Sequence, residues 1–122
     1  MNIGDGSMYR EINSLDELNK ALEGSNDRPA IFFKHSISCG VSTRALAEFR
    51  RYLEDAGATP VDHYLIIVQT ARQASDSLAG LIGVVHESPQ AIIVREGRAV
   101  WHDSHLALKS GAILEAVRSA AG

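Results

Sequence analysis

Residues 30–57 read AIFFKHSISCGVSTRALAEFRRYLEDAG and contain an apolar run, a polar turn and an amphipathic stretch, in that order. The apolar run at residues 30–33 is too short for a buried helix and rich in strand formers, which predicts a central strand. Apolar residues then recur at helical spacing until Gly57, a typical terminator, so we expect a helix over residues 41–56. Cys39 therefore lies where the loop after a strand enters a helix.

The flanking segments continue this alternation of strand and helix. Ser14 and Glu17 have the spacing of a capping box, and the leucines that follow share one face of a short helix that ends at Gly24. After the cysteine-bearing helix, residues 64–68 predict a second strand covered on both faces, and residues 69–82 predict another helix. Because helices connect successive strands, we expect right-handed crossovers and parallel strand pairing.

The last third of the chain replaces this alternation with a hairpin. Residues 90–94 predict a strand, Glu96-Gly97 a tight turn, and residues 98–101 the returning strand, which adds an antiparallel edge to the sheet. Residues 110–120 predict a final helix. The element order helix, strand, helix, strand, helix, strand, strand, helix defines an α/β fold in which helices flank a central four-stranded mixed sheet.

Length and charge limit the organisation and the partners. With 122 residues the chain has room for one domain, which we place at residues 9–122. Residues 1–8 show no apolar period and are interpreted as a disordered leader or a cloning remnant. A formal charge of -3 argues against a nucleic-acid surface or a polybasic membrane anchor. Since the sequence shows neither an apolar run of membrane-spanning length nor a signal-peptide pattern, we expect a cytoplasmic protein that binds no nucleic acid and no membrane.

The chain contains a single cysteine, which excludes an intramolecular disulfide and a Cys-rich zinc site. Cys39 lies at the first turn of the predicted helix, where unpaired N–H groups and the positive end of the helix dipole stabilise a thiolate. Ser42 follows in C-x-x-S spacing, so its hydroxyl can donate a hydrogen bond to that thiolate. The alternatives are an inert structural cysteine and a serine tolerated in a first helical turn.

Charged neighbours of Cys39 offer further contacts. Lys34 and His35 precede it and can add positive potential to the site, or they are solvated surface residues. Arg44 lies one turn beyond Gly40 and can meet an anionic group on a small thiol, although an exposed helix arginine has the same pattern.

Ser88-Pro89 stands directly before the strand predicted at residues 90–94. An X-Pro bond at this place is compatible with a trans or a cis peptide. A cis bond would turn the peptide groups of Ser88 outward, where they can pair with an extended substrate or a thiol tripeptide as an added strand.

The histidines show no spacing typical of metal ligands, so we expect no metal site and no resident cofactor. Those outside the cysteine segment are His63, His86, His102 and His105.

The element order, the thiol between the first strand and its helix, and Ser-Pro before the hairpin together resemble the thioredoxin fold. In that fold the matching proline is typically cis and faces the reactive cysteine. The closer resemblance is to the bacillithiol-system redox proteins, the YtxJ-like monothiol bacilliredoxins, over residues 9–121. It rests on FKHS at residues 33–36 with Cys39 and Ser42, and on HESPQ at residues 86–90.

This resemblance implies a thiol-disulfide oxidoreductase that removes bacillithiol from mixed disulfides on oxidised proteins. Cys39 is then the nucleophile, Ser42 stands in place of a resolving cysteine, and Phe33 stands where thioredoxins bury an acid that serves the second sulfur. The partners so implied are S-thiolated proteins and a low-molecular-weight thiol as co-substrate. The residues expected to contact substrate are Ser88, Pro89, His35, Gly40 and Arg44.

Two other functions remain open at the level of sequence. Gly40-Val41 after the cysteine is similar to the Cys-Gly-Phe-Ser of monothiol glutaredoxins, so an iron–sulfur cluster carrier, in which two chains each supply Cys39 and two external thiols complete the ligation, stays an alternative. A thioredoxin-like binding module without redox turnover is the third possibility. In every redox scheme an external thiol must complete turnover, because the chain has no second cysteine to close a ring.

Overall fold

The structure is a computed structural model and describes residues 9–56 and 59–121. The segment predicted as a leader, residues 1–8, and the predicted helix stop at Gly57 lie outside the described residues. In chain order the elements are β1 (Arg10–Glu11), α1 (Leu15–Gly24), β2 (Ala30–His35), α2 (Gly40–Ala56), β3 (Asp62–Ile67), α3 (Arg72–Ile82), β4 (Gln90–Arg95), β5 (Arg98–Ser104), a short 3-10 helix (His105–Ala107) and α4 (Ser110–Ala121).

The strands form one mixed sheet in the order β1-β3-β2-β4-β5. β2 pairs in parallel with β3 and antiparallel with β4, and β4 pairs antiparallel with β5, which confirms the mixed sheet and its hairpin edge. The predicted number of strands was wrong, because the described residues contain five. The added strand, β1, pairs Arg10 with Tyr64 and Glu11 with Leu65. Two residues are too few to show an alternating pattern, so this strand has no recognisable signal in the sequence.

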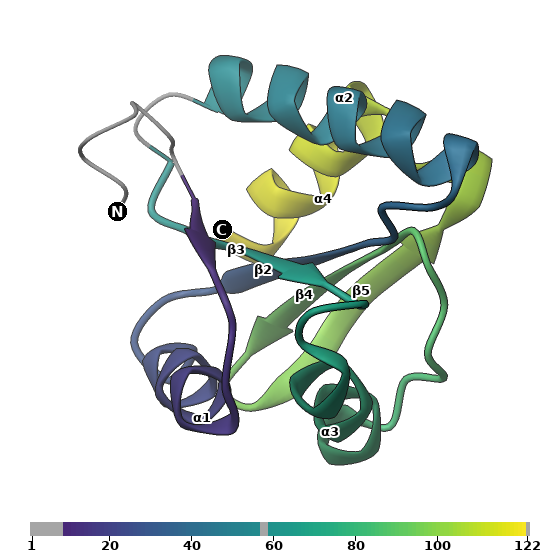
Figure 1. The fold of residues 1–122 in the computed structure, drawn as a ribbon. Helices are drawn as coiled ribbons and strands as arrows, with labels where there is room; N and C mark the ends of the chain where they lie inside the picture. The colour runs from purple at the N-terminus through teal and green to yellow at the C-terminus, as the bar shows by residue number, and fades with distance from the viewer. Residues whose placement is uncertain (1–8, 57–58, 122) are drawn as a thin grey trace.

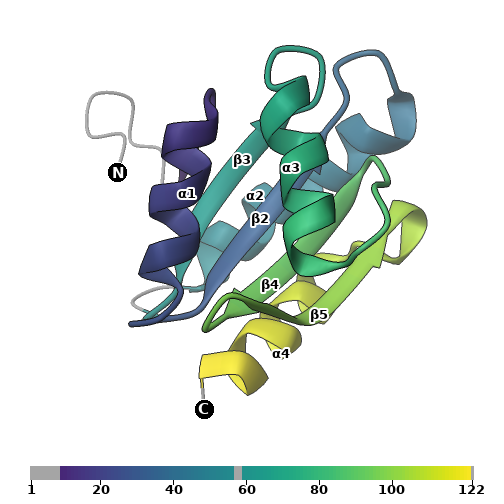
Figure 2. The same ribbon diagram turned by 90° about the horizontal axis from the view of Figure 1, so that it is seen from below.

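Helices cover both faces of the sheet, with α2 and α4 on one side and α1 and α3 on the other (Figures 1 and 2). Every residue of β2 is buried, as expected for the middle strand. Its side chains alternate between the two layers, so that Phe33 faces α2 while Phe32 faces the opposite core. The Phe33 ring stacks on Phe49 of α2 with centroids 4.8 Å apart, which fixes α2 over the sheet.

Several element ends differ from their predicted positions. β5 continues to Ser104 because its backbone stays paired with β4 as far as Gln90, although its last residues are polar. The turn at Glu96 and Gly97 has positive φ values of 53° and 75°, which confirms the predicted tight hairpin turn. α3 starts at Arg72 rather than at residue 69. Within the described residues, no helix has the length and apolar character needed to span a bilayer.

The first helix provides a test of the capping box. Ser14 Oγ accepts a hydrogen bond from Glu17 N at 3.2 Å, and Glu17 Oε1 accepts one from Asn13 N at 2.7 Å. We expect Ser14→Ala to lower the free energy of unfolding by about 1 kcal/mol, because the exposed N–H group loses its partner without creation of a cavity. Urea denaturation measures this loss. Ser119→Ala, on an exposed position inside α4, is the matched control and should cost nothing; equal stability of the two variants would contradict the cap.

Candidate active site at the start of α2

Cys39 occupies the N-cap position of α2. Its carbonyl oxygen accepts a hydrogen bond from Thr43 N at 3.1 Å, the first bond of the helix. The N–H groups of residues 40–42 therefore have no partner within the helix, and they lie next to the half-buried side chain of Cys39. Unpaired N–H groups at the start of a helix are donors that can reach an anionic group. The structure confirms the predicted placement of the cysteine between a strand and its helix.

The turn before Cys39, Ser36 to Ser38, is held from two sides. From α2, the buried Ser42 Oγ accepts a hydrogen bond from Ser36 N at 2.9 Å. From the loop after β3, the Gln69 amide accepts a hydrogen bond from Ile37 N at 3.1 Å and donates to Ser36 Oγ at 2.8 Å and Ser38 Oγ at 3.3 Å. Gln69 was not predicted as a site residue, because in the sequence it falls at the start of a predicted helix.

Ser42 is fully buried, and its contacts differ from the expected one. Its Oγ lies 2.8 Å from His35 Nδ1 in addition to its bond with Ser36 N. Among the described residues, no hydrogen bond joins Ser42 to Cys39. The hydroxyl therefore holds the turn and the histidine ring in this structure, and direct donation to the thiolate stays a prediction.

Lys34 and His35 are both buried, so the alternative that they are solvated surface residues is wrong. Burial lowers the pKa of His35 below its usual value of 6.5, with Arg50 adding to this and the hydrogen bond with Ser42 opposing it. The ring is therefore uncharged at neutral pH and does not supply the expected positive potential. Lys34 points to the other face of the sheet, where its Nζ lies 3.0 Å from Ser75 O and 3.1 Å from His86 Nδ1.

The Ser88-Pro89 peptide is cis, as the resemblance implies. The antiparallel register pairs Lys34 with Gln90, so the residue before Gln90, Pro89, lies opposite His35. This is the end of β2 from which the turn to Cys39 departs. The start of α2, the loop before β4 and the end of β5 accordingly gather at one end of the molecule (Figures 1 and 2). Ser88 Oγ is buried and has no hydrogen-bond partner in the described part of the chain, an arrangement that is uncommon in native structures.

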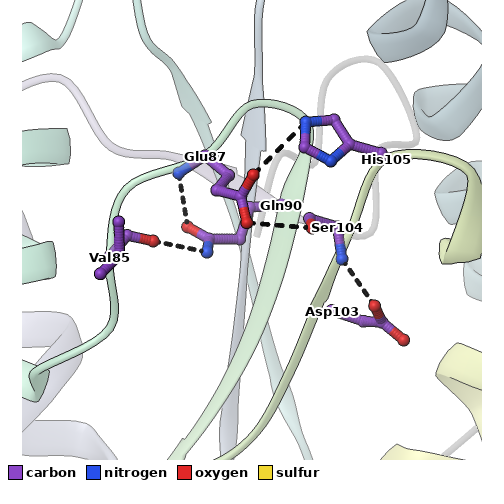
Figure 3. Close-up of polar contacts among 6 residues, drawn as sticks. All are labelled: Val85, Glu87, Gln90, Asp103, Ser104 and His105. Atoms are coloured by element: carbon purple, nitrogen blue, oxygen red, sulfur yellow. Dashed lines mark hydrogen bonds and ion pairs between the residues drawn. The ribbon is translucent and has the colours of Figure 1, made fainter.

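Contacts from Gln90 of β4, Ser104 of β5 and His105 of the 3-10 helix fasten the loop that carries Ser88-Pro89 (Figure 3). Glu87 accepts a hydrogen bond from Ser104 Oγ at 3.3 Å and faces His105 Nε2 at 3.6 Å. The Gln90 amide donates to Val85 O at 3.0 Å and accepts from Glu87 N at 3.4 Å. The backbone N of His105 donates to Pro89 O at 3.1 Å. The cis peptide is thereby fixed relative to the sheet.

Comparison with known proteins identifies the family. The sequence model of one family, monothiol bacilliredoxin BrxC, matches residues 10–113. The chain belongs to the monothiol bacilliredoxin family. This bacilliredoxin also resembles a solved structure with a thioredoxin fold, described provisionally as an oxidoreductase, at 29% identity with a TM-score of 0.78; the match covers 89% of this chain and 93% of that chain.

Two thioredoxins share the fold of this bacilliredoxin at low sequence identity. Fasciola hepatica thioredoxin is 14% identical with a TM-score of 0.72, over 91% of this chain and 98% of that chain. Thioredoxin f from spinach chloroplast is 17% identical with a TM-score of 0.73, over 94% of this chain and 95% of that chain. The thioredoxin-like fold is therefore confirmed, and the family indicates a thiol redox role with thiol-bearing protein partners.

The remaining predicted contacts of the bacilliredoxin lie on its surface. Gly40 and Arg44 are exposed on the first turns of α2, and space is open around the position that a side chain at Gly40 would take. Their roles in substrate binding stay predictions. Over the described ranges, no cluster of three or more His, Cys, Asp or Glu residues is placed to hold a metal ion.

Proposed function

We propose that this bacilliredoxin removes bacillithiol from protein mixed disulfides by monothiol exchange at Cys39. The observation that carries the proposal is the position of the only sulfur nucleophile at the N-cap of α2, at the sheet end that also holds the cis Ser88-Pro89 peptide. Membership of the monothiol bacilliredoxin family supports bacillithiol as the small thiol.

The first step exchanges one disulfide for another. The Cys39 thiolate attacks the bacillithiol sulfur of the mixed disulfide, the sulfur–sulfur bond to the protein breaks, and the protein cysteine leaves as a thiolate that takes a proton from water. Cys39 is left joined to bacillithiol. In the second step, the thiolate of a free low-molecular-weight thiol attacks the bacillithiol sulfur and releases the Cys39 thiolate with a disulfide of two small thiols. The free thiol is the reductant, and each exchange breaks one disulfide bond and forms another, so the number of disulfide bonds does not change.

The residues near Cys39 fit a reaction with an external second thiol. Ser42 occupies the place of a resolving cysteine, and its hydroxyl cannot expel bacillithiol from Cys39. Phe33 is fully buried against α2, so the position expected to hold an acid for a second sulfur is apolar. The chemistry requires a reduced Cys39, and we place it in the cytoplasm, where thiols are kept reduced.

Substrate binding follows from the same sheet end. The peptide groups of Ser88, at the fixed cis bond, are proposed to pair with an extended segment of the thiolated protein. Gly40 leaves the approach to the sulfur open, and Arg44 is proposed to meet a carboxylate of the small thiol. His35 is proposed to act through Ser42, because it is buried and uncharged.

A reporter protein carrying bacillithiol on one cysteine tests this function. We expect the bacilliredoxin to accelerate loss of bacillithiol from the reporter when free bacillithiol is the reductant. The same reporter carrying glutathione, with glutathione as reductant, shows whether the small thiol is selected. Equal rates with and without the protein, for both reporters, would contradict the proposal. If the protein showed a visible absorbance after anaerobic loading with iron and sulfide, and also showed no reductase activity, the iron–sulfur cluster carrier would be favoured instead.

A further inference from the structure

We propose that Gln69 is a positioning residue for Cys39, and that its side-chain amide sets the direction in which the sulfur leaves the first turn of α2. The inference deepens the proposed function and rests on Cys39 being the nucleophile. Gln69 lies 30 positions along the sequence from Cys39, in the loop between β3 and α3.

The amide of Gln69 reaches three consecutive residues. Its Oε1 accepts from Ile37 N at 3.1 Å, and its Nε2 donates to Ser36 Oγ at 2.8 Å and to Ser38 Oγ at 3.3 Å. These three residues form the turn that ends at Cys39. Both the acceptor and the donor end of the amide are thus used, whereas an ionised carboxylate at this position would supply acceptors alone.

Gln69 is itself well placed to hold the turn. The preceding residue, Val68, is buried, and its N–H group donates to His35 O at 2.9 Å, which ties the end of β3 to the end of β2. Thr70 N donates to Ile67 O at 3.1 Å and bends the chain there. The side chain therefore projects from a backbone that is anchored to the same strand from which the cysteine turn departs.

Besides these bonds and the one from Ser36 N to Ser42 Oγ at 2.9 Å, few contacts hold the turn. The Ile37 side chain is 62% exposed, so packing contributes little. The bond from Cys39 N to Ser36 O is long, at 3.4 Å. On its other side Cys39 is fixed by the helix, through the bond between its carbonyl and Thr43 N. The backbone angles that aim the Cys39 side chain therefore depend on the turn, and Gln69 supplies three of its hydrogen bonds.

Loss of the Gln69 amide should change the orientation of the Cys39 sulfur more than the stability of the fold. Gln69 lies at the surface, so water can hydrate the groups that lose it, and global stability should change little. The turn would sample several conformations, and in many of them the sulfur points away from the free N–H groups of α2. The thiolate would then lose part of its stabilisation, and the fraction ionised at neutral pH would fall.

The test is alkylation of Cys39 by iodoacetamide as a function of pH, in the full-length chain, with thermal unfolding measured alongside. We expect Gln69→Ala to shift the inflection of the rate upward by about half a pH unit or more, the size of one lost hydrogen bond. Gln69→Glu keeps an acceptor for Ile37 N, removes the donors and adds a negative charge, so its shift should be larger. Gln73→Ala is the matched control, since Gln73 is exposed on α3 and its side chain makes no hydrogen bond within the described chain.

The outcomes separate this inference from the proposed function. Shifted profiles in both Gln69 variants, with unfolding temperatures close to that of Gln73→Ala, support the positioning role. A profile of Gln69→Ala that overlays the wild type would overturn it while leaving Cys39 as nucleophile. A lowered unfolding temperature with an unchanged profile would assign Gln69 a structural role only. A wild-type inflection at the pH of an ordinary free thiol would instead count against the proposed thiolate.

Discussion

Replacing Cys39 with serine is expected to lower the rate of bacillithiol removal from a reporter protein by about 10³-fold or more, to the rate of exchange with the free thiol alone. A serine hydroxyl is not ionised at neutral pH, and the chain has no other sulfur that can form a disulfide. The measurement is release of the reporter thiol at a fixed concentration of bacillithiol. A Cys39→Ser protein that kept more than roughly a tenth of the activity would contradict the assigned nucleophile.

Ser42→Ala is the informative companion variant, because it changes the serine of the C-x-x-S segment and leaves the sulfur of Cys39 in place. Ser42 is buried, and its loss leaves Ser36 N and His35 Nδ1 without their partner. We expect activity to fall by roughly tenfold while the reaction continues, since the turn is loosened and the nucleophile remains. Complete loss of activity in a folded Ser42→Ala protein would show that its oxygen takes part in the chemistry.

The second large effect concerns Lys34, whose side chain is fully buried under α3. Burial lowers the pKa of its ammonium group from 10.5 to about 8, with Asp76 opposing the shift. Between these two pH values the unfolded chain binds a proton at Lys34 and the folded chain does not. Stability should therefore rise as the pH increases from about 8 toward 10, and the full shift corresponds to about 3 kcal/mol.

Lys34→Met tests this dependence, because methionine has a similar length and no charge. We expect the free energy of unfolding of wild type to increase from about pH 8 to pH 10, and that of Lys34→Met to stay flat over the same interval. Keeping below pH 10 avoids the phenols of the buried Tyr52 and the half-buried Tyr64, whose pKa values are raised by burial and whose ionisation destabilises the fold at higher pH. Lys20→Met, on an exposed lysine, is the control and should keep the rise. An equal rise in Lys34→Met would show that another group is responsible.

Local sequence patterns predicted the main elements and the position of the thiol. The run of strand formers before Cys39 and the helical spacing after it give β2 and α2 almost residue for residue, because each has a clear period and a clear end. β2 nevertheless extends beyond its apolar run to His35. The polar residue Lys34 can be buried there because its Nζ lies within hydrogen-bond distance of Ser75 O and His86 Nδ1, which are more than 40 positions away in the sequence. No local sequence pattern indicates such distant partners.

The candidate site was predictable where it depends on neighbours in sequence and unpredictable where it depends on tertiary contacts. Cys39 at a helix start follows from spacing, and the cis Ser88-Pro89 bond from resemblance. The roles of Ser42 and Gln69 arise from hydrogen bonds to the turn before the cysteine, whose partners are set by how the sheet brings β2 and β3 together. A surface glutamine after a strand gives no signal of such a role.

Mass spectrometry of a single turnover tests the monothiol mechanism most directly. The bacilliredoxin is mixed with an equal amount of bacillithiolated reporter in the absence of any free thiol. One bacillithiol per chain should move from the reporter to the peptide that contains Cys39, the reporter should be recovered with a free thiol, and added bacillithiol should then regenerate the unmodified peptide. A reporter that keeps its bacillithiol, or a disulfide that joins the reporter directly to Cys39, would contradict attack on the small-thiol sulfur.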